Sequence, residues 1–312
     1  MNALVFRPSA YAPFMRASEV EANGLTFHFE VGGEQHQPTV LLIMGLGAQM
    51  LLWTETFCQH LIESGFRVIR FDNRDIGLSS KIRKKNKRLN TMALMGKFAV
   101  GLRNHGAPYT LYDMAEDTSK LIDALQLDQV HVIGASMGGM IAQILAAKHP
   151  EQVKSLNLLF TSNNRAFLPP PGYKQLKALI GRPKGHDEDS MVEHATRLVT
   201  TIGSPNHVDL DKARDLTRLL YRRSFSPAGV MQQYLAILCT GSLVEVDRRI
   251  QKPTLVLHGS HDKLLPPSHG RAVAKAIHGA KFRLIDGMGH DIPDAFAPKL
   301  AALYARHMKL HG

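Results

Sequence analysis

The stretch HVIGASMGGMIAQ, residues His131–Gln143, decides how the rest of the sequence is interpreted. It begins with a short apolar run typical of a buried strand and ends in an apolar segment with helical spacing. Between them, GASMG (Gly134–Gly138) fits the pattern G-x-S-x-G. A sharp strand-to-helix turn would strain the backbone of Ser136, and only small residues two positions to either side would avoid a clash. The pattern therefore predicts a serine hydroxyl held out at the end of a strand.

The same alternation of apolar strand and helix occurs on both sides of this stretch. Strands are expected at Thr39–Met44, Phe66–Phe71, Val130–Ile133, Val153–Phe160, Pro253–Gly259 and Phe282–Ile285. An early segment of alternating polarity around Asn23-Gly24 predicts an antiparallel hairpin at the sheet edge. Repeated βαβ units require a parallel arrangement. We therefore expect an α/β fold with a mostly parallel, eight-stranded sheet and helices on both faces.

The alternation is lost between residues 162 and 249, where long stretches have helical spacing. A connection of this length within a compact domain must have structure of its own. We expect a core domain formed by residues 1–161 and 250–312, with an inserted helical cap formed by residues 162–249.

Two further strand ends supply partners for the serine. A serine hydroxyl needs a base to accept its proton, and the base needs an acid to orient it. Asp262 lies a few residues beyond the strand TLVLHG, and His290 lies in a glycine-containing loop beyond the strand FRLI. Parallel strands bring these ends to the same edge as Ser136. The rival acids are Asp286, Asp291 and Asp294. We predict Ser136 as nucleophile, His290 as base and Asp262 as acid.

An oxyanion formed at the serine would need two N–H donors. Met137 N–H is one by position, and the loop MGLGAQ after the first central strand is expected to supply the other. Leu46 N–H is the first choice and Gly47 N–H the second. Residues predicted to line the substrate site are Gly45, Gly47, Trp53, Phe167 and Tyr234.

These motifs carry a family resemblance. The chain resembles the α/β-hydrolase superfamily over nearly its whole length, through MGLGAQ, FDNRDIGLS, GASMGG, HGSHD and GMGH in that order. It is most similar to capped serine esterases of the aclacinomycin methylesterase type. The resemblance implies ester hydrolysis without a cofactor, with the site residues already named. Met44 stands where many members have a histidine that helps to hold the oxyanion loop.

Composition limits the other classes of function. The 312 residues carry a net charge of +11, but six cations lie within Lys81–Arg88. No recognition helix or zinc-finger spacing accompanies this charge, so no nucleic-acid partner is expected. The segment Lys81–Leu102 is a candidate for weak contact with an anionic membrane, or else a solvated loop followed by an apolar run beside the cap.

Two cysteines far apart, and no signal-like start, favour a cytoplasmic protein. No metal-ligand spacing, phosphate-loop lysine or complete dinucleotide motif occurs, so neither a metal nor a cofactor is expected. Nothing in the sequence indicates an oligomeric state.

The function predicted from the sequence is hydrolysis of a carboxylic ester of a small to medium apolar substrate through an acyl-enzyme. Acyl transfer, C–C bond hydrolysis or perhydrolysis would use the same three residues. A non-catalytic binding protein on the same fold is a further alternative, against which the complete set of Ser136, Asp262 and His290 argues.

Overall fold

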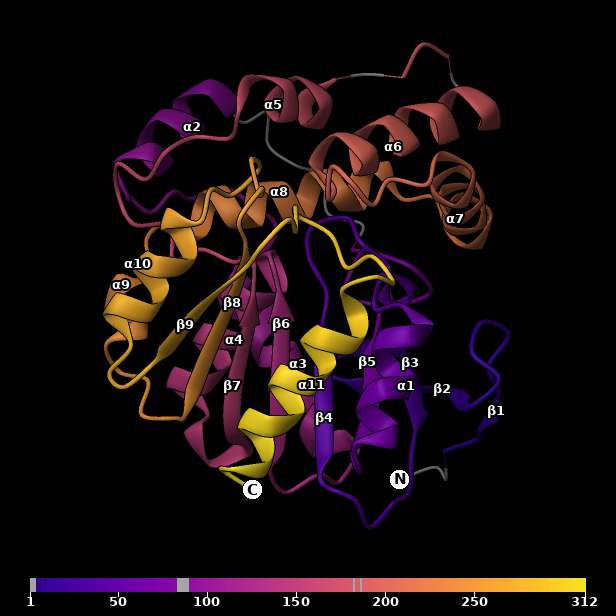
Figure 1. The fold of residues 1–312 in the computed structure, drawn as a ribbon. Helices are drawn as coiled ribbons and strands as arrows, with labels where there is room; N and C mark the ends of the chain where they lie inside the picture. The colour runs from indigo at the N-terminus through magenta and orange to yellow at the C-terminus, as the bar shows by residue number, and fades with distance from the viewer. Residues whose placement is uncertain (1–3, 83–89, 182, 186) are drawn as a thin grey trace.

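The computed structural model describes residues 4–82, 90–181, 183–185 and 187–312. Within these residues nine strands form one sheet in the order β1-β2-β3-β5-β4-β6-β7-β8-β9 (Figure 1). The strands are β1 (Arg7–Pro8), β2 (Met15–Ala22), β3 (Leu25–Gly32), β4 (Thr39–Ile43), β5 (Arg67–Phe71), β6 (Val130–Ala135), β7 (Val153–Leu159), β8 (Thr254–Gly259) and β9 (Lys281–Ile285). All neighbours from β5 to β9 pair in parallel. The predicted α/β fold with a mostly parallel sheet is confirmed.

The prediction of eight strands was wrong by one. The additional strand, β1, is only two residues long and pairs Arg7 with Ala17 and Pro8 with Arg16. A stretch this short contains no alternation of polarity from which a strand can be recognised. The predicted hairpin follows it: β2 and β3 pair antiparallel around a turn in which Asn23 and Gly24 both have positive φ.

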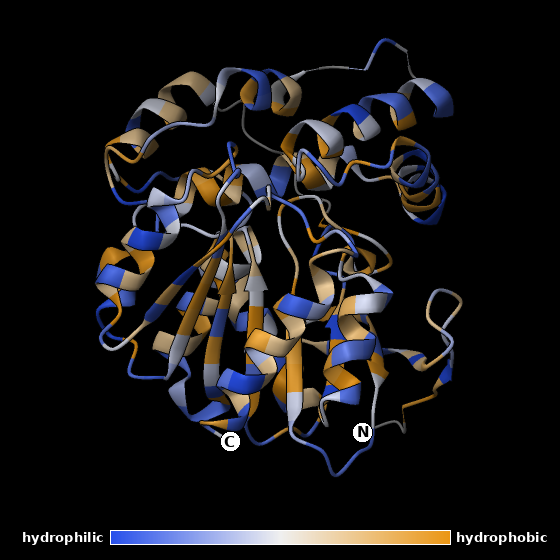
Figure 2. Cartoon of the chain, viewed as in Figure 1, coloured by the Kyte–Doolittle hydropathy of each residue, from blue (hydrophilic) through white to orange (hydrophobic). Residues whose placement is uncertain are grey.

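Successive residues of the central strands enter two different cores, one on each face of the sheet. Leu41 and Ile43 of β4 join a cluster with side chains from α3 and α4, whereas Val40 and Leu42 join a cluster with α1 and α11. Side chains alternate between the faces of a strand, so a strand covered on both sides must be apolar throughout. The apolar strand centres and the more polar outer surfaces of the helices are visible in Figure 2.

Helices cover both faces of the sheet and one end of it (Figure 1). The helices that follow core strands are α1 (Glu55–Glu63), α3 (Leu111–Ala124), α4 (Met137–Lys148), α10 (Ser268–Ala276) and α11 (Ala297–Lys309). The four-residue α9 (Val244–Asp247) lies between α8 and β8. Short 3₁₀ turns lie at Met50–Leu52 and Pro150–Gln152. Among the described residues, no helix has the length and apolar character needed to cross a membrane.

Besides the short α9, four helices fold between β7 and β8, within the region expected to form the cap. They are α5 (Tyr173–Ile180), α6 (Glu188–Ile202), α7 (Leu210–Arg223) and α8 (Pro227–Thr240), and we call them the inserted helices. A fifth helix, α2 (Thr91–Ala99), lies beside them in Figure 1 although it precedes α3 in the chain. Leu94 of α2 packs with Leu235 and Leu238 of α8. This helix belongs to the predicted segment Lys81–Leu102, of which residues 83–89 lie outside the described residues.

A chain of buried polar groups connects the sheet to α11. His131 Nδ1 lies 2.8 Å from Ser155 Oγ, and His307 Nδ1 lies 2.8 Å from Asn157 Oδ1. Asn157 also donates to Ser155 Oγ at 3.2 Å. Burial, with a smaller contribution from nearby positive charge, lowers the pKa of His131 and of His307 to about 4. Both rings are therefore held neutral in the folded chain at pH 7.

These two histidines predict that stability falls in mild acid. In the unfolded chain a histidine titrates near 6.5, so between about pH 4 and 6.5 the unfolded state binds more protons. The contribution of these neutral histidines to the free energy of unfolding is complete above pH 6.5 and is lost as the pH falls toward 4. The urea midpoint is expected to be lower at pH 5.0 than at pH 7.5. The variant His131→Asn/His307→Gln should lose part of this dependence, whereas the surface control His105→Gln should keep it. An unchanged slope in the double variant would contradict the assignment.

Candidate active site

Ser136 occupies the junction between β6 and α4 in a backbone conformation that is rare for a residue with a side chain. Its φ is +54° and its ψ is −120°. Its carbonyl oxygen accepts from Gly139 N at 3.0 Å and from Thr161 Oγ1 at 2.6 Å, and its N–H donates to Leu159 O at 3.0 Å. A non-glycine residue in such a region costs on the order of 1–3 kcal/mol unless the surroundings impose it. The hydrogen bonds made by the N–H and by the carbonyl oxygen of Ser136 impose this conformation here.

The glycines on either side of Ser136 allow three backbone segments to approach closely. A Cβ atom added to Gly134 would lie 2.5 Å from Gly138 O, and one added to Gly138 would lie 2.0 Å from Ile43 O. A Cβ on Gly139 would lie 2.6 Å from the Thr161 side chain. The predicted requirement for small residues therefore arises from the first turn of α4 at Gly134 and from β4 at Gly138, and Gly139 adds a close contact with the loop after β7.

The three predicted side chains form one hydrogen-bonded chain. His290 Nε2 lies 3.0 Å from Ser136 Oγ, and His290 Nδ1 lies 2.7 Å from Asp262 Oδ2. Because the carboxylate accepts from Nδ1–H, Nε2 is left as an acceptor for the serine proton. The serine side is partly exposed, whereas Asp262 and His290 are buried. This arrangement can remove the proton of Ser136 and stabilise the imidazolium that results.

Asp262 is held in its ionised form. Burial alone would raise its pKa, but the His290 charge and the hydrogen bonds from His258 and His290 outweigh burial and lower the pKa well below its usual range. The other carboxylate oxygen, Oδ1, accepts from the N–H groups of Leu264 and Leu265, both at 2.9 Å. The rival acids have other partners: Asp286 accepts from Ser260, Asp291 from Ser204 and Asp294 from Thr56.

Two residues that lie beside the hydrogen-bonded Ser136, His290 and Asp262 were not identified from the sequence. His258 Nε2 lies 3.2 Å from Asp262 Oδ2 and 2.7 Å from Leu265 O, so it adds a donor to the carboxylate. The ring of Phe160 lies 4.4 Å from the His290 ring, between centroids. His258 precedes the glycine of HGSHD, and a second histidine near the acid was the only available signal.

The loop that carries His290 contacts the end of inserted helix α6. His290 N donates to Ile202 O at 2.8 Å, and Gly289 N donates to Ser204 Oγ at 2.9 Å. A Cβ atom on Gly289 would lie 2.4 Å from the carbonyl of Gly203. The inserted helices therefore help to fix the position of His290.

The loop after β4 approaches Ser136 from the other side. A Cβ on Gly45 would lie 3.1 Å from Ser136 Cβ, so this predicted site residue lies directly against the serine. Among the described residues, the N–H groups of Leu46 and Met137 have no hydrogen-bond partner, whereas Gly47 N donates to Gln233 Oε1 at 2.8 Å. Leu46, the first choice for the second oxyanion donor, is thus available, and Gly47 is occupied.

The remaining predicted substrate residues lie in three different surroundings. The prediction that Trp53 lines the substrate site is wrong, because its side chain is fully buried. Its ring stacks on Phe57 with centroids 5.3 Å apart. It belongs to the core under α1 and α11 and not to a substrate site. Phe167 is 84% exposed, and Tyr234 packs partly buried beside the α2–α8 cluster.

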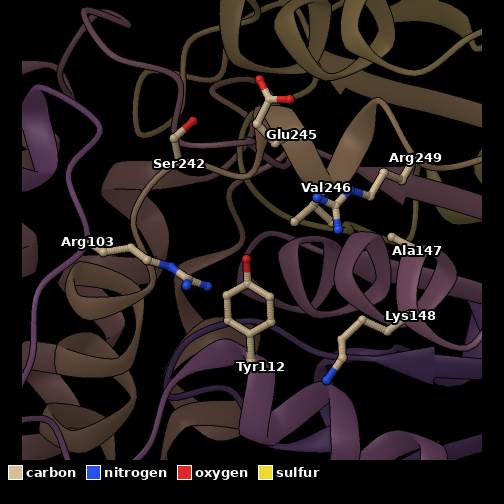
Figure 3. Close-up of a pocket in the computed structure, with 8 residues that line it drawn as sticks. All are labelled: Arg103, Tyr112, Ala147, Lys148, Ser242, Glu245, Val246 and Arg249. Carbon is tan, nitrogen blue, oxygen red and sulfur yellow. The ribbon is translucent and has the colours of Figure 1, made fainter.

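A pocket of about 430 Å³ lies elsewhere, where the chain returns from α8 to the core (Figure 3). Its lining residues are Arg103, Tyr112, Ala147, Lys148, Ser242, Glu245, Val246 and Arg249. It contains none of the residues around Ser136, so it is separate from the candidate active site.

The chain is similar to known proteins over most of its length, including the segments that carry Ser136, Asp262 and His290. Residues 38–294 match the sequence model of the family described as the alpha/beta hydrolase fold. Rhodomycin D methylesterase of Streptomyces peucetius is 26% identical over 298 residues, which cover 89% of this chain and 93% of that protein. Poly(3-hydroxyalkanoate) depolymerase of Ectopseudomonas oleovorans is 30% identical over 259 residues, which cover 83% of this chain and 80% of that protein. The solved structure of the enol-lactonase from Burkholderia xenovorans LB400 has a TM-score of 0.70 at 21% identity, covers 93% of this chain and 99% of that one, and shares the fold.

The close contact at Gly138 predicts a large effect of a single methyl group. Gly138→Ala should destabilise the protein by roughly 1–3 kcal/mol or more, because the new Cβ meets the β4 backbone and not a flexible side chain. Gly96→Ala is the matched control, since Gly96 lies within α2 with open space around it. Replacement there should be neutral or stabilising by up to about 1 kcal/mol. Urea unfolding measures both, and a Gly138→Ala variant as stable as the parent would contradict the packing described.

Proposed function

The chain belongs to the alpha/beta hydrolase family, and from this premise we propose that it is a serine hydrolase that cleaves carboxylic esters. The observation that carries the proposal is the chain of hydrogen bonds from Ser136 through His290 to Asp262. A methylesterase among the relatives favours an ester as the substrate.

The proposed reaction begins at the serine hydroxyl. Ser136 Oγ attacks the ester carbonyl carbon while His290 Nε2 accepts the hydroxyl proton. The carbonyl oxygen becomes an oxyanion, and in this proposal the N–H groups of Leu46 and Met137 bind it. Collapse of the tetrahedral intermediate breaks the bond to the alcohol, and His290 returns the proton to the departing alcohol oxygen. An acyl-Ser136 ester remains.

Water completes the cycle by the same steps in the second half. His290 accepts a proton from water, the resulting hydroxide attacks the acyl carbon, and a second oxyanion forms in the same place. Collapse releases the carboxylic acid and returns the proton to Ser136 Oγ. Asp262 stays ionised throughout, which its lowered pKa favours.

The substrate proposed is a small to medium apolar ester. Apolar side chains lie beside the reacting groups: Phe160 contacts the His290 ring, and Val230 of α8 lies against Gly47. Apolar surface of this kind binds a substrate in proportion to the area that it removes from water. The inserted helices would then cover the acyl or alcohol group.

The direct test is labelling with a fluorophosphonate probe together with hydrolysis of p-nitrophenyl esters. The probe should modify Ser136, because an activated hydroxyl attacks phosphorus in a geometry close to that of acyl transfer. Peptide mass spectrometry locates the label. Ser136→Ala should abolish labelling and turnover without unfolding the chain. Modification of another serine, or turnover that survives Ser136→Ala, would refute the proposal.

The choice of acid is tested separately. Asp262→Asn should reduce kcat by about 10³–10⁴-fold, because an amide favours the wrong imidazole tautomer. Asp286→Asn is the matched control, since Asp286 follows the neighbouring strand but hydrogen-bonds Ser260. Steady-state kinetics on p-nitrophenyl butyrate should show near-parental kcat for this control. The opposite pattern would mean that the acid is misassigned.

A further inference from the structure

The inserted helix α8 places a buried glutamine against the loop after β4. Gln233 is completely buried and lies on α8, far from Gly47 in sequence. We propose that Gln233 is a positioning residue that aligns the Leu46 N–H for the oxyanion, an inference that rests on the proposed ester hydrolysis.

Both halves of the Gln233 amide are used. Oε1 accepts from Gly47 N at 2.8 Å, and Nε2 donates to Arg74 O at 2.9 Å. A buried amide with both groups paired has a single orientation, because reversing it would place a donor against Gly47 N–H and an acceptor against Arg74 O. The Leu46–Gly47 peptide plane is therefore fixed from the side of α8.

The other end of this loop is fixed independently. Asn73 Nδ2 donates to Met44 O at 2.9 Å, so Leu46 lies between two anchored peptide groups. Gly45 and Gly47 flank Leu46, and glycine backbones reorient easily unless they are held. Gly47 has a φ of +66°, and a Cβ there would lie 3.1 Å from Val230 of α8. Within the loop, Ala48 N also donates to Gly45 O at 3.3 Å. Without Gln233, Gly47 N–H would lose its hydrogen bond, while this bond and the one from Asn73 would remain.

The second contact of Gln233 leads to a rigid part of the core. Arg74 forms a buried ion pair with Asp117 of α3, and Asn23 also donates to Asp117. The backbone of α8 also approaches the loop after β5 that contains Arg74, since a Cβ on Gly229 would lie 2.2 Å from Asp75 O. Gln233 is therefore hydrogen-bonded both to the backbone of Arg74, whose side chain pairs with α3, and to the loop that holds Leu46.

The test compares two neighbouring glutamines on the same helix. Gln233→Met keeps the side-chain length and removes both hydrogen bonds. Gln232→Met is the matched control, because Gln232 is also buried but donates to Ile82 O at 3.0 Å, whereas the hydrogen bond to Gly47 N comes from Gln233. Both are assayed on p-nitrophenyl butyrate, with kcat expressed per active site titrated by the fluorophosphonate probe.

Acylation and deacylation both pass through an oxyanion, so a misaligned Leu46 N–H should slow both steps together. For Gln233→Met we expect kcat to fall about 10- to 100-fold with KM changed less than about 2-fold. The pH dependence of kcat/KM should keep its midpoint, because His290 is not altered. Gln232→Met should keep kcat per titrated site. A merely structural role would lower the number of titrated sites and leave kcat per site unchanged.

Three outcomes separate the possibilities. Parental kcat per site in Gln233→Met, or a change confined to KM, would overturn the positioning role while leaving the proposed hydrolase intact. A parent chain without esterase activity or Ser136 labelling would instead reject the proposed function itself. If Gln233→Met does not fold, amide hydrogen exchange of the parent decides: Gly47 N–H should exchange slowly and Leu46 N–H fast, and equally fast exchange would overturn the proposal.

Discussion

The backbone conformation of Ser136 is the constraint on which the rest of the candidate site depends. At a φ of +54° the serine is presented to the loop after β4 and to His290, and in an ordinary helical conformation it would follow the path of α4. Such a conformation persists only where its surroundings enforce it. Here the Thr161 hydroxyl and the Gly139 N–H bind its carbonyl, and Gly138 touches the β4 backbone. The nucleophile proposed for the reaction is therefore positioned by the first turn of α4, by β4 and by the loop after β7.

The inserted helices contact two loops of the site. The end of α6 accepts the His290 N–H through Ile202 O, and α8 holds the loop after β4 through Gln233. The loop of the base contacts one inserted helix, and the loop of one proposed oxyanion donor, Leu46, contacts another. A change in how these helices pack would consequently reach the chemistry through backbone contacts, in addition to altering the shape of the space above Ser136.

Much of this arrangement could be predicted because it is encoded locally. The apolar runs marked the buried strands, and the glycines around Ser136 marked a close approach of backbones, although not which backbone they meet. The order Ser136, Asp262 and His290 followed from three strand ends, and the competing acids were separated only by their hydrogen bonds to Ser260, Ser204 and Thr56.

The features that escaped prediction depend on contacts between distant parts of the chain. Gln233 meets Gly47 across 186 residues of sequence, and no local pattern distinguishes it from Gln232. The position of α2 beside α8 and the burial of Trp53 are likewise decided by packing.

We propose that the Ser136 turn and the loop after β4 form one preorganised site for an oxyanion. A crystal structure of the protein after reaction with diethyl p-nitrophenyl phosphate measures this directly, since the phosphoryl oxygen of the adduct occupies the place of the oxyanion. We expect a bond from Ser136 Oγ to phosphorus, with the phosphoryl oxygen about 2.7–3.1 Å from both Leu46 N and Met137 N. A phosphoryl oxygen directed away from these two N–H groups, or an adduct on a different residue, would contradict the account.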